Sequence, residues 1–202
     1  RSIRTTGVPE SVLQEKISDL IDNYKEICDI AFLPHRMLGV DIRITSIDNE
    51  KIEELISLIV KRIKKYVYGF DTDKLEEVIA NLFIKNNLTI STAESCTAGL
   101  LGAKLTDFPG SSSYYKGGSI CYSNELKISD VNVDKKLIDK FGAVSEEVAG
   151  ALAEGIARKN STDIGIGITG IAGPDGGTEK KPVGLVFVCL LYTSDAADEE
   201  DS

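Results

Sequence analysis

The stretch Thr92-Ala-Glu-Ser-Cys-Thr-Ala-Gly99 decides the fold together with Ile168-Thr-Gly-Ile-Ala-Gly-Pro-Asp-Gly-Gly177 further along the chain. Each stretch follows a short apolar run that is typical of a buried strand, and each then breaks into small, polar or glycine residues. In α/β folds the loops at the carboxyl ends of the strands form the ligand crevice. Strands and helices alternate around both stretches: a helix is expected from about Thr97, a strand at 118–123, and a helix capped by Ser145 with two glutamates in its first turn. This alternation predicts a three-layer α/β/α sandwich of the α/β class.

The strand expected over 163–169 alternates isoleucine with Gly165 and Gly167. A glycine face lets a helix or a ligand approach the sheet closely. Gly165–Gly170 also matches the pattern G-x-G-x-x-G, but a dinucleotide fingerprint must turn directly into a helix. The following Gly173-Pro-Asp-Gly-Gly177 forbids a helix there, so we expect a loop. Its backbone N–H groups could hold a phosphate or a carbonyl, and a plain surface turn is the alternative.

Residues 1–70 read as a separate small α+β domain with the order βαββα. Strands are expected at 2–6, 28–33 and 40–45, where alternation leaves one face buried. A first helix opens at Pro9, and a second carries an apolar stripe at helical spacing that we extend to Val67. The end of this helix carries a basic patch made of Lys61, Arg62, Lys64 and Lys65. Basic residues there favour the helix dipole; a nucleic-acid patch is the alternative.

The 202-residue chain carries a net charge of −9, and five of these negative charges are Asp195, Asp198, Glu199, Glu200 and Asp201. The rest of the chain is only mildly acidic, so its charge does not favour nucleic-acid binding.

No apolar run suits a membrane span and no signal peptide is evident. Four scattered cysteines indicate reduced thiols, so we expect a cytoplasmic protein. The only histidine, His35, argues against a Ser/His/Asp triad and against a metal site built on histidine.

Hydrolytic chemistry without histidine needs another base, and one group of residues could supply it. Ser112 follows a Pro-Gly turn, Tyr122 ends an expected strand, and Lys127 lies in the first turns of the next helix. An ammonium beside the phenol lowers the tyrosine pKa, and the phenolate could then accept the serine proton. A core tyrosine and a surface lysine remain the ordinary alternative. Ser113-Tyr-Tyr-Lys116 also matches S-x-x-K, but its partner motifs are absent.

Residues 73–190 resemble the carboxy-terminal domain of the CinA family of competence/damage-inducible proteins, which are nicotinamide mononucleotide amidohydrolases. The resemblance rests on these segments taken in order: Thr92–Gly99, Pro109-Gly-Ser-Ser112, Tyr122-Ser-Asn-Glu125 with Lys127, Gly142-Ala-Val-Ser-Glu146, Gly170–Gly177 and Lys181-Pro-Val-Gly184. Residues 1–70 resemble the middle, KH-like domain of the family. They contain no G-x-x-G loop, so RNA binding of the KH type is not supported.

The resemblance implies hydrolysis of the nicotinamide carboxamide to nicotinic acid mononucleotide and ammonia, with neither metal nor cofactor. It implies Ser112 as the nucleophile, with Tyr122 and Lys127 as its activating pair. It also implies a homodimer formed through the carboxy-terminal domain. Substrate binding is expected from the loops after the two decisive strands, at Glu94, Ser95, Thr97, Gly99, Thr169, Gly170, Ala172 and Gly173.

The expected domains are therefore 1–70, KH-like; 71–191, a truncated amidohydrolase domain; and 192–202, a non-native disordered tail. Members of the family continue past the last strand with an arginine-bearing segment, so we expect this chain to be weakly active or inactive. A nucleotide-binding module without turnover is one alternative function. An interaction scaffold built on the KH-like domain is another, and the basic patch at Lys61–Lys65 is its only support.

Overall fold

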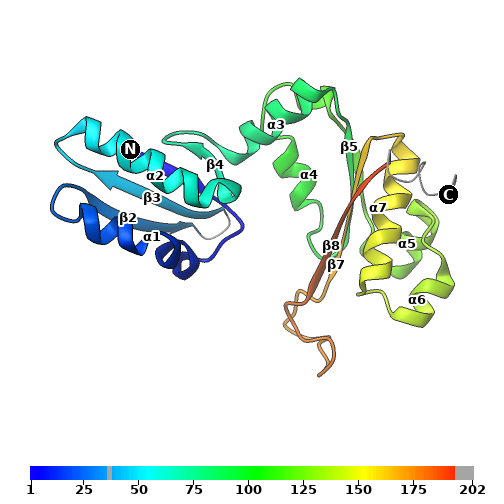
Figure 1. The fold of residues 1–202 in the computed structure, drawn as a ribbon. Helices are drawn as coiled ribbons and strands as arrows, with labels where there is room; N and C mark the ends of the chain where they lie inside the picture. Colours follow the sequence, from blue (N-terminus) through cyan, green and yellow to red (C-terminus); the bar gives the residue numbers. More distant parts are fainter. Residues whose placement is uncertain (36–37, 194–202) are drawn as a thin grey trace, which may run out of the picture. The chain divides into compact units, whose positions relative to one another are not determined.

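The computed structural model describes residues 1–35 and 38–193, which fall into two compact units divided between Val78 and Ile79. Each unit has its own sheet and its own apolar core, and each is described by itself (Figure 1). No helix within the described residues is both long and apolar enough to span a membrane.

The first unit is a four-stranded antiparallel sheet with two helices. Its elements are β1 (Ser2–Thr5), α1 (Glu10–Tyr24), β2 (Asp29–His35), β3 (Gly39–Thr45), α2 (Asn49–Ile63), the 3₁₀ turn η1 (Lys64–Tyr66) and β4 (Val67–Phe70). The strand order is β2-β3-β1-β4. Both helices bury one apolar stripe, represented by Leu13 and Ile17 in α1 and by Leu55 and Ile59 in α2. The small α+β domain predicted from the sequence is therefore present.

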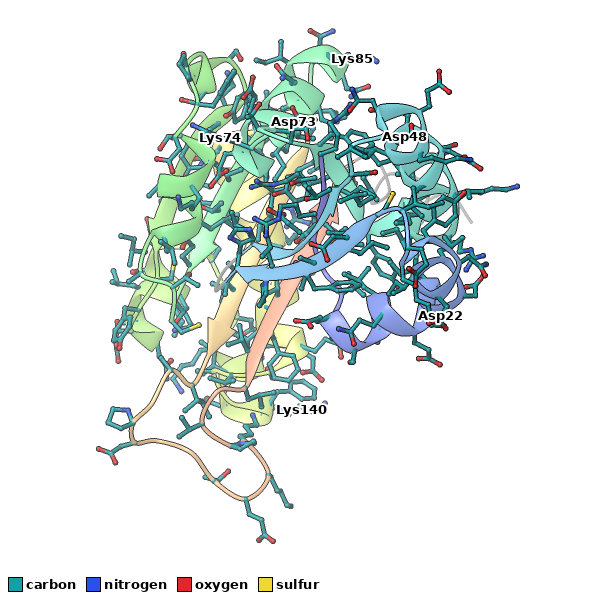
Figure 2. The ribbon with its side chains drawn as sticks, turned by 90° about the vertical axis from the view of Figure 1, so that its left-hand side faces the viewer. Asp22, Asp48, Asp73, Lys74, Lys85 and Lys140 are labelled. Atoms are coloured by element: carbon teal, nitrogen blue, oxygen red, sulfur yellow. The ribbon has the colours of Figure 1, made fainter. Side chains whose placement is uncertain are left out.

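The second helix of this unit is shorter than the sequence suggested. It begins after Asp48, whose side chain accepts hydrogen bonds from the N–H groups of Glu50 and Lys51 and which is labelled in Figure 2. It ends at Ile63, whereas we expected the apolar stripe to continue to Val67. Val67 instead opens β4, which pairs with β1. The expected order βαββα thus missed a closing strand, whose four residues are too few to show alternation.

The second unit is a mixed four-stranded sheet with helices on both faces. Its elements are α3 (Leu75–Asn86), which begins just before the boundary, β5 (Ile90–Glu94), α4 (Leu100–Leu105), η2 (Ser111–Ser113), β6 (Tyr115–Ile120), α5 (Asn124–Val131), α6 (Lys135–Phe141), α7 (Glu146–Asn160), β7 (Ile164–Gly170) and β8 (Val186–Tyr192). The order is β6-β5-β7-β8; β5 is parallel to β6 and β7, and β8 is antiparallel to β7.

The three-layer arrangement predicted from the sequence is confirmed. α3 and α4 lie on one face of the sheet and α5, α6 and α7 on the other (Figure 1). Gly165 and Gly167 face α7, where an added Cβ would lie 2.1 Å from the carbonyl oxygens of Ala153 and Ala149. Any side chain there would push the helix off the sheet, so the expected close approach of a helix to the glycine face is also confirmed.

Several element boundaries differ from the expectation. β6 covers Tyr115–Ile120 rather than 118–123, so Tyr122 follows the strand instead of ending it. α4 begins at Leu100 rather than near Thr97, because Ala98 and Gly99 have positive φ angles that no helix contains. Tyr192, which we assigned to the tail, is the last residue of β8. The N–H of Thr193 donates to Asp163, and residues 194–202 lie outside the described residues.

Candidate functional site

A pocket of about 170 Å³ lies at the carboxyl ends of β5 and β7. Four stretches of chain line it: the segment after β5, the turn from β6 into α5, the segment before α7 and the loop after β7. The lining residues are Ser95, Cys96, Tyr122, Asn124, Lys127, Ala143, Val144, Thr169, Gly170 and Ala172. This is the end of the sheet at which the sequence predicted a ligand crevice.

Lys127 is the most unusual side chain of the pocket. It projects from α5 and is 2% exposed, although an ammonium is rarely buried without a partner of opposite charge. Its Nζ donates to Ser95 Oγ at 3.2 Å and to the carbonyl oxygens of Cys121 at 2.9 Å and Tyr122 at 3.3 Å. All three acceptors are neutral. Burial lowers the Lys127 pKa, which brings the neutral amine within reach of a proton-accepting role.

Ser95 is the first residue after β5, and its N–H donates to the carbonyl oxygen of Ile168 in β7. This bond fixes the start of the loop against the neighbouring strand. In β7, Thr169 Oγ1 donates to the carbonyl oxygen of Ala143 at 2.7 Å, which holds the segment before α7 against the sheet. Cys96 lies beside Ser95, and burial raises the pKa of its thiol. The walls of the pocket are therefore tied together by hydrogen bonds that do not involve a ligand.

Tyr122 lies at the mouth of the pocket with 70% of its surface exposed. Lys127 reaches its main-chain carbonyl oxygen, as given above, while the phenol ring faces outward. The lysine and the tyrosine are neighbours, as the sequence suggested. The hydrogen bond between them is made by the backbone rather than by the phenol oxygen.

Ser112 lies at the opposite end of β6 from Tyr122. It belongs to η2, which precedes the strand, and its hydroxyl-bearing side chain is exposed. η2 is a single 3₁₀ turn of three residues and not the start of a helix. The Lys116 ammonium donates to the carbonyl oxygens of Ser112 and Ser113 and holds this turn against the strand. Within one chain, Ser112 is not brought together with Tyr122 and Lys127.

A second hollow, of about 250 Å³, lies between α4 and the edge of the sheet and contains two of the predicted binding residues, Glu94 and Gly99. The Glu94 carboxylate accepts the N–H groups of Gly99 at 3.1 Å, Leu101 at 3.0 Å and Gly102 at 2.8 Å. A carboxylate at this position stabilises the start of α4 through charge and hydrogen bonding. Both of its oxygens are thus already engaged by the helix.

Comparison with known proteins identifies the chain. Residues 72–200 match the CinA C-terminal domain, and residues 1–69 match the damage-inducible protein CinA KH domain. The chain belongs to the CinA family. Among its relatives is a "CinA-like protein" of Dictyoglomus thermophilum, 44% identical over 99% of this chain and 50% of that protein. A "putative competence-damage inducible protein" of Clostridium botulinum is 47% identical over 93% of this chain and 47% of its own length.

Solved structures of the CinA family share the fold of part of this chain. The competence/damage inducible protein CihA of Agrobacterium tumefaciens is 36% identical with a TM-score of 0.59, over 63% of this chain and 77% of that one. The competence damage-inducible protein A of Klebsiella pneumoniae is 31% identical with a TM-score of 0.57, over 58% and 73%. The chain spans about half the length of the curated relatives it matches.

The CinA fold brings some of the predicted site residues together and leaves others apart. Ser95, Thr169, Gly170 and Ala172 line one pocket with Tyr122 and Lys127. Glu94 and Gly99 line the other hollow. Thr97 and Gly173 line neither, although the Thr97 hydroxyl oxygen is buried and has no hydrogen-bond partner within the described residues. Gly173 lies in the loop between β7 and β8, which Figure 2 shows projecting from the end of the sheet.

Four further residues of the pocket were not predicted from the sequence. Cys96, Asn124, Ala143 and Val144 all line it, and all lie inside segments that carried the CinA resemblance. The resemblance could therefore have indicated these residues, because the segments that carry it meet at this pocket. Over residues 1–35 and 38–193 the structure contains no group of three or more His, Cys, Asp or Glu side chains placed to hold a metal ion.

Proposed function

We propose that this CinA-family protein hydrolyses the carboxamide of nicotinamide mononucleotide to nicotinic acid mononucleotide and ammonia. The observation that carries the proposal is the buried Lys127. Its Nζ donates hydrogen bonds to three neutral oxygens, and one of them belongs to Ser95, which lines the pocket with it. Lysines whose pKa is lowered by burial serve as general bases. A base of this kind replaces the histidine of ordinary serine hydrolases, and the only histidine here, His35, lies in the other unit.

The proposed reaction begins with attack of the Ser112 hydroxyl oxygen on the carboxamide carbon. Tyr122 and Lys127 together receive the serine proton, and the Ser95 hydroxyl, 3.2 Å from Lys127 Nζ, provides a path for it. The C–N bond then breaks, and the departing nitrogen takes the proton and leaves as ammonia. The ester left on the serine is hydrolysed by water: a new C–O bond forms, the C–Oγ bond breaks and the serine recovers its proton.

The substrate is proposed from the family resemblance and from the size of the pocket. About 170 Å³ is below the range of roughly 300–1,000 Å³ usual for pockets that hold a whole ligand. We therefore propose that it takes the carboxamide end of the nucleotide, while the ribose phosphate lies outside. Of the residues predicted from the sequence to bind substrate, we propose that Ser95, Thr169, Gly170 and Ala172, which line this pocket, hold the carboxamide end.

The test is ammonia release from nicotinamide mononucleotide by the purified chain. We expect weak release, as predicted for this chain from the sequence, which resists chelators and is lost in Ser112→Ala and in Lys127→Met, with both variants folded by circular dichroism. Release that persists in Lys127→Met would contradict the proposal.

A nucleotide-binding module without turnover is the second candidate, and the separation of Ser112 from Lys127 at opposite ends of β6 favours it. It predicts calorimetric binding of nicotinamide mononucleotide with no product. We also propose that the protein is a cytoplasmic homodimer joined through its second unit. Sedimentation of the intact chain measures that assembly directly.

A further inference from the structure

The proposed nucleophile and the proposed base lie at opposite ends of one strand. Ser112 precedes β6 and Tyr122 follows it, and the six residues of β6 alone span about 20 Å at 3.3 Å per residue. The strand is hydrogen-bonded to β5 over its length, from the Ile90–Tyr115 pair to the Glu94–Ile120 pair. Because a paired strand does not shorten, no loop movement within one chain closes this gap.

β6 is also an edge of the sheet. It pairs with β5 on one side, and no strand covers its other side within the described residues. The alternate residues Lys116, Gly118 and Ile120 are exposed; Gly118 and Ile120 lie on the face beside α4, and Ile120 exposes 54% of its surface. An exposed edge of this kind offers unpaired N–H and C=O groups to another strand. Its single charged side chain, Lys116, is bonded to carbonyl oxygens of its own chain and does not block the edge.

A two-fold axis near the middle of β6 would pair this edge with the same edge of a second copy. The two strands would then run antiparallel, so that the start of one lies beside the end of the other. The turn Ser111–Ser113 precedes the start, and Tyr122 follows the end. The pairing therefore carries Ser112 of the second copy to the mouth of the pocket that holds Tyr122 and Lys127.

We propose that two copies of this chain pair along β6 and that each supplies Ser112 to the pocket of the other. This inference rests on the proposed function, because it takes Ser112 as the nucleophile. It accounts for two observations: the separation of Ser112 from Lys127 in one chain, and a pocket too small to enclose a nucleotide. The other edge of the sheet, β8, could also pair, but a β8 dimer leaves Ser112 at a distance from both pockets.

Complementation between two inactive variants tests the exchange of Ser112. Ser112→Ala and Lys127→Met are co-expressed with different tags, and doubly tagged dimers are isolated. Random pairing makes half of all dimers mixed, each with one intact site, so the unfractionated mixture should regain about a quarter of the wild-type rate. The matched control pairs Ser112→Ala with the double variant Ser112→Ala/Lys127→Met, and it should regain none.

Three outcomes of this experiment overturn the proposal. Mixed dimers without activity would place the whole site in one chain. Activity in Ser112→Ala alone would make another residue, such as Ser95, the nucleophile. Isolation of only monomers would remove the second copy altogether. A wild-type chain that releases no ammonia would instead contradict the proposed function, and the pairing is then decided by measurements that need no activity.

Two such measurements are available. A short bis-maleimide should link the double variant Ser112→Cys/Tyr122→Cys into covalent dimers but leave Ser112→Cys/Val188→Cys monomeric, with the single variants as the background for native cysteines. Ile120→Asp should dissociate the dimer in sedimentation, whereas Val188→Asp, on β8 and 64% exposed against 54% for Ile120, should not. The reverse pattern in either measurement would assign the interface to β8 and overturn the proposal.

Discussion

Lys127 Nζ lies 3.2 Å from Ser95 Oγ, and this contact joins a helix to the end of a strand 32 residues earlier in the sequence. The helix α5 carries the lysine inward beneath the turn that follows β6. The strand β5 ends at Glu94 and presents the next residue, Ser95, to the same pocket. The pair is buried, so the ammonium exchanges the solvation of water for three neutral oxygens.

The first prediction concerns the charge of Lys127. Lys127→Met keeps most of the side-chain volume and removes the base, so we expect the rate of ammonia release to fall by about 10²–10⁴-fold. Lys127→Arg keeps the charge but cannot give up its proton, and it should be equally inactive. The readout is kcat/KM on nicotinamide mononucleotide. An active Lys127→Arg would show that the charge matters and the proton transfer does not.

The pH dependence of activity follows from the direction of the same pKa. Burial lowers the Lys127 pKa, so the neutral amine forms at a pH below the ordinary lysine value of about 10.4. We expect kcat/KM to rise with pH through that lowered pKa. The rising limb should be absent from the residual activity of Lys127→Met. A limb near the ordinary lysine value in the wild-type protein would contradict the buried position of the amine.

Stability should respond to pH for the same reason. Between the lowered pKa of the folded state and the ordinary value of the unfolded chain, the unfolded state binds more protons at Lys127. The contribution of Lys127 to the free energy of unfolding therefore increases as pH rises through that window. The same contribution is lost as pH falls through the folded-state pKa. Urea unfolding of the wild type and of Lys127→Met at several pH values should show this difference.

The packing of α7 on β7 gives a prediction that is independent of function. Gly167→Ala would place its Cβ 2.1 Å from the Ala149 carbonyl oxygen and 2.6 Å from the Ala153 nitrogen. We expect a loss of about 1–3 kcal/mol or more in the free energy of unfolding, since backbone atoms cannot move aside cheaply. Gly150→Ala is the matched control in α7: nothing lies within 4 Å, so it should stabilise by about 0.5–1 kcal/mol.

Glu94 provides a further prediction, which separates a structural from a binding role. Glu94→Gln keeps the shape but removes the negative charge that faces three N–H groups at the start of α4. We expect a lower free energy of unfolding with little change in KM for nicotinamide mononucleotide. A raised KM at unchanged stability would instead support the substrate-binding role that the sequence predicted for this residue.

The sequence predicted the layers of the second unit because its long helices and buried strands carry clear periodic patterns. Ser145, for example, caps α7 by accepting the N–H of Val148, as its position before two glutamates indicated. β4 was missed because its four residues are too short for a pattern and gain their stability by pairing with β1, far away in sequence. Tertiary contacts of this kind have no local signal.

The pocket was predictable in part. Ser95 and Thr169 were expected at strand ends, and parallel strands bring their carboxyl ends to one edge. The burial of Lys127 was not expected, because a lysine in the first turns of a helix ordinarily faces solvent. The separation of Ser112 from Tyr122 follows from the direction of β6 alone, but only once the start of that strand is known to be Tyr115 rather than Gly118.

The central claim is that the pocket around Lys127 cleaves an amide. Mass spectrometry of the products after incubation with nicotinamide mononucleotide tests it most directly, with the reaction run in ¹⁸O-labelled water. We predict nicotinic acid mononucleotide that carries the label in its carboxylate, together with ammonia. Free nicotinamide, which would report cleavage of the glycosidic bond, or unchanged substrate in the presence of folded dimer would contradict the account.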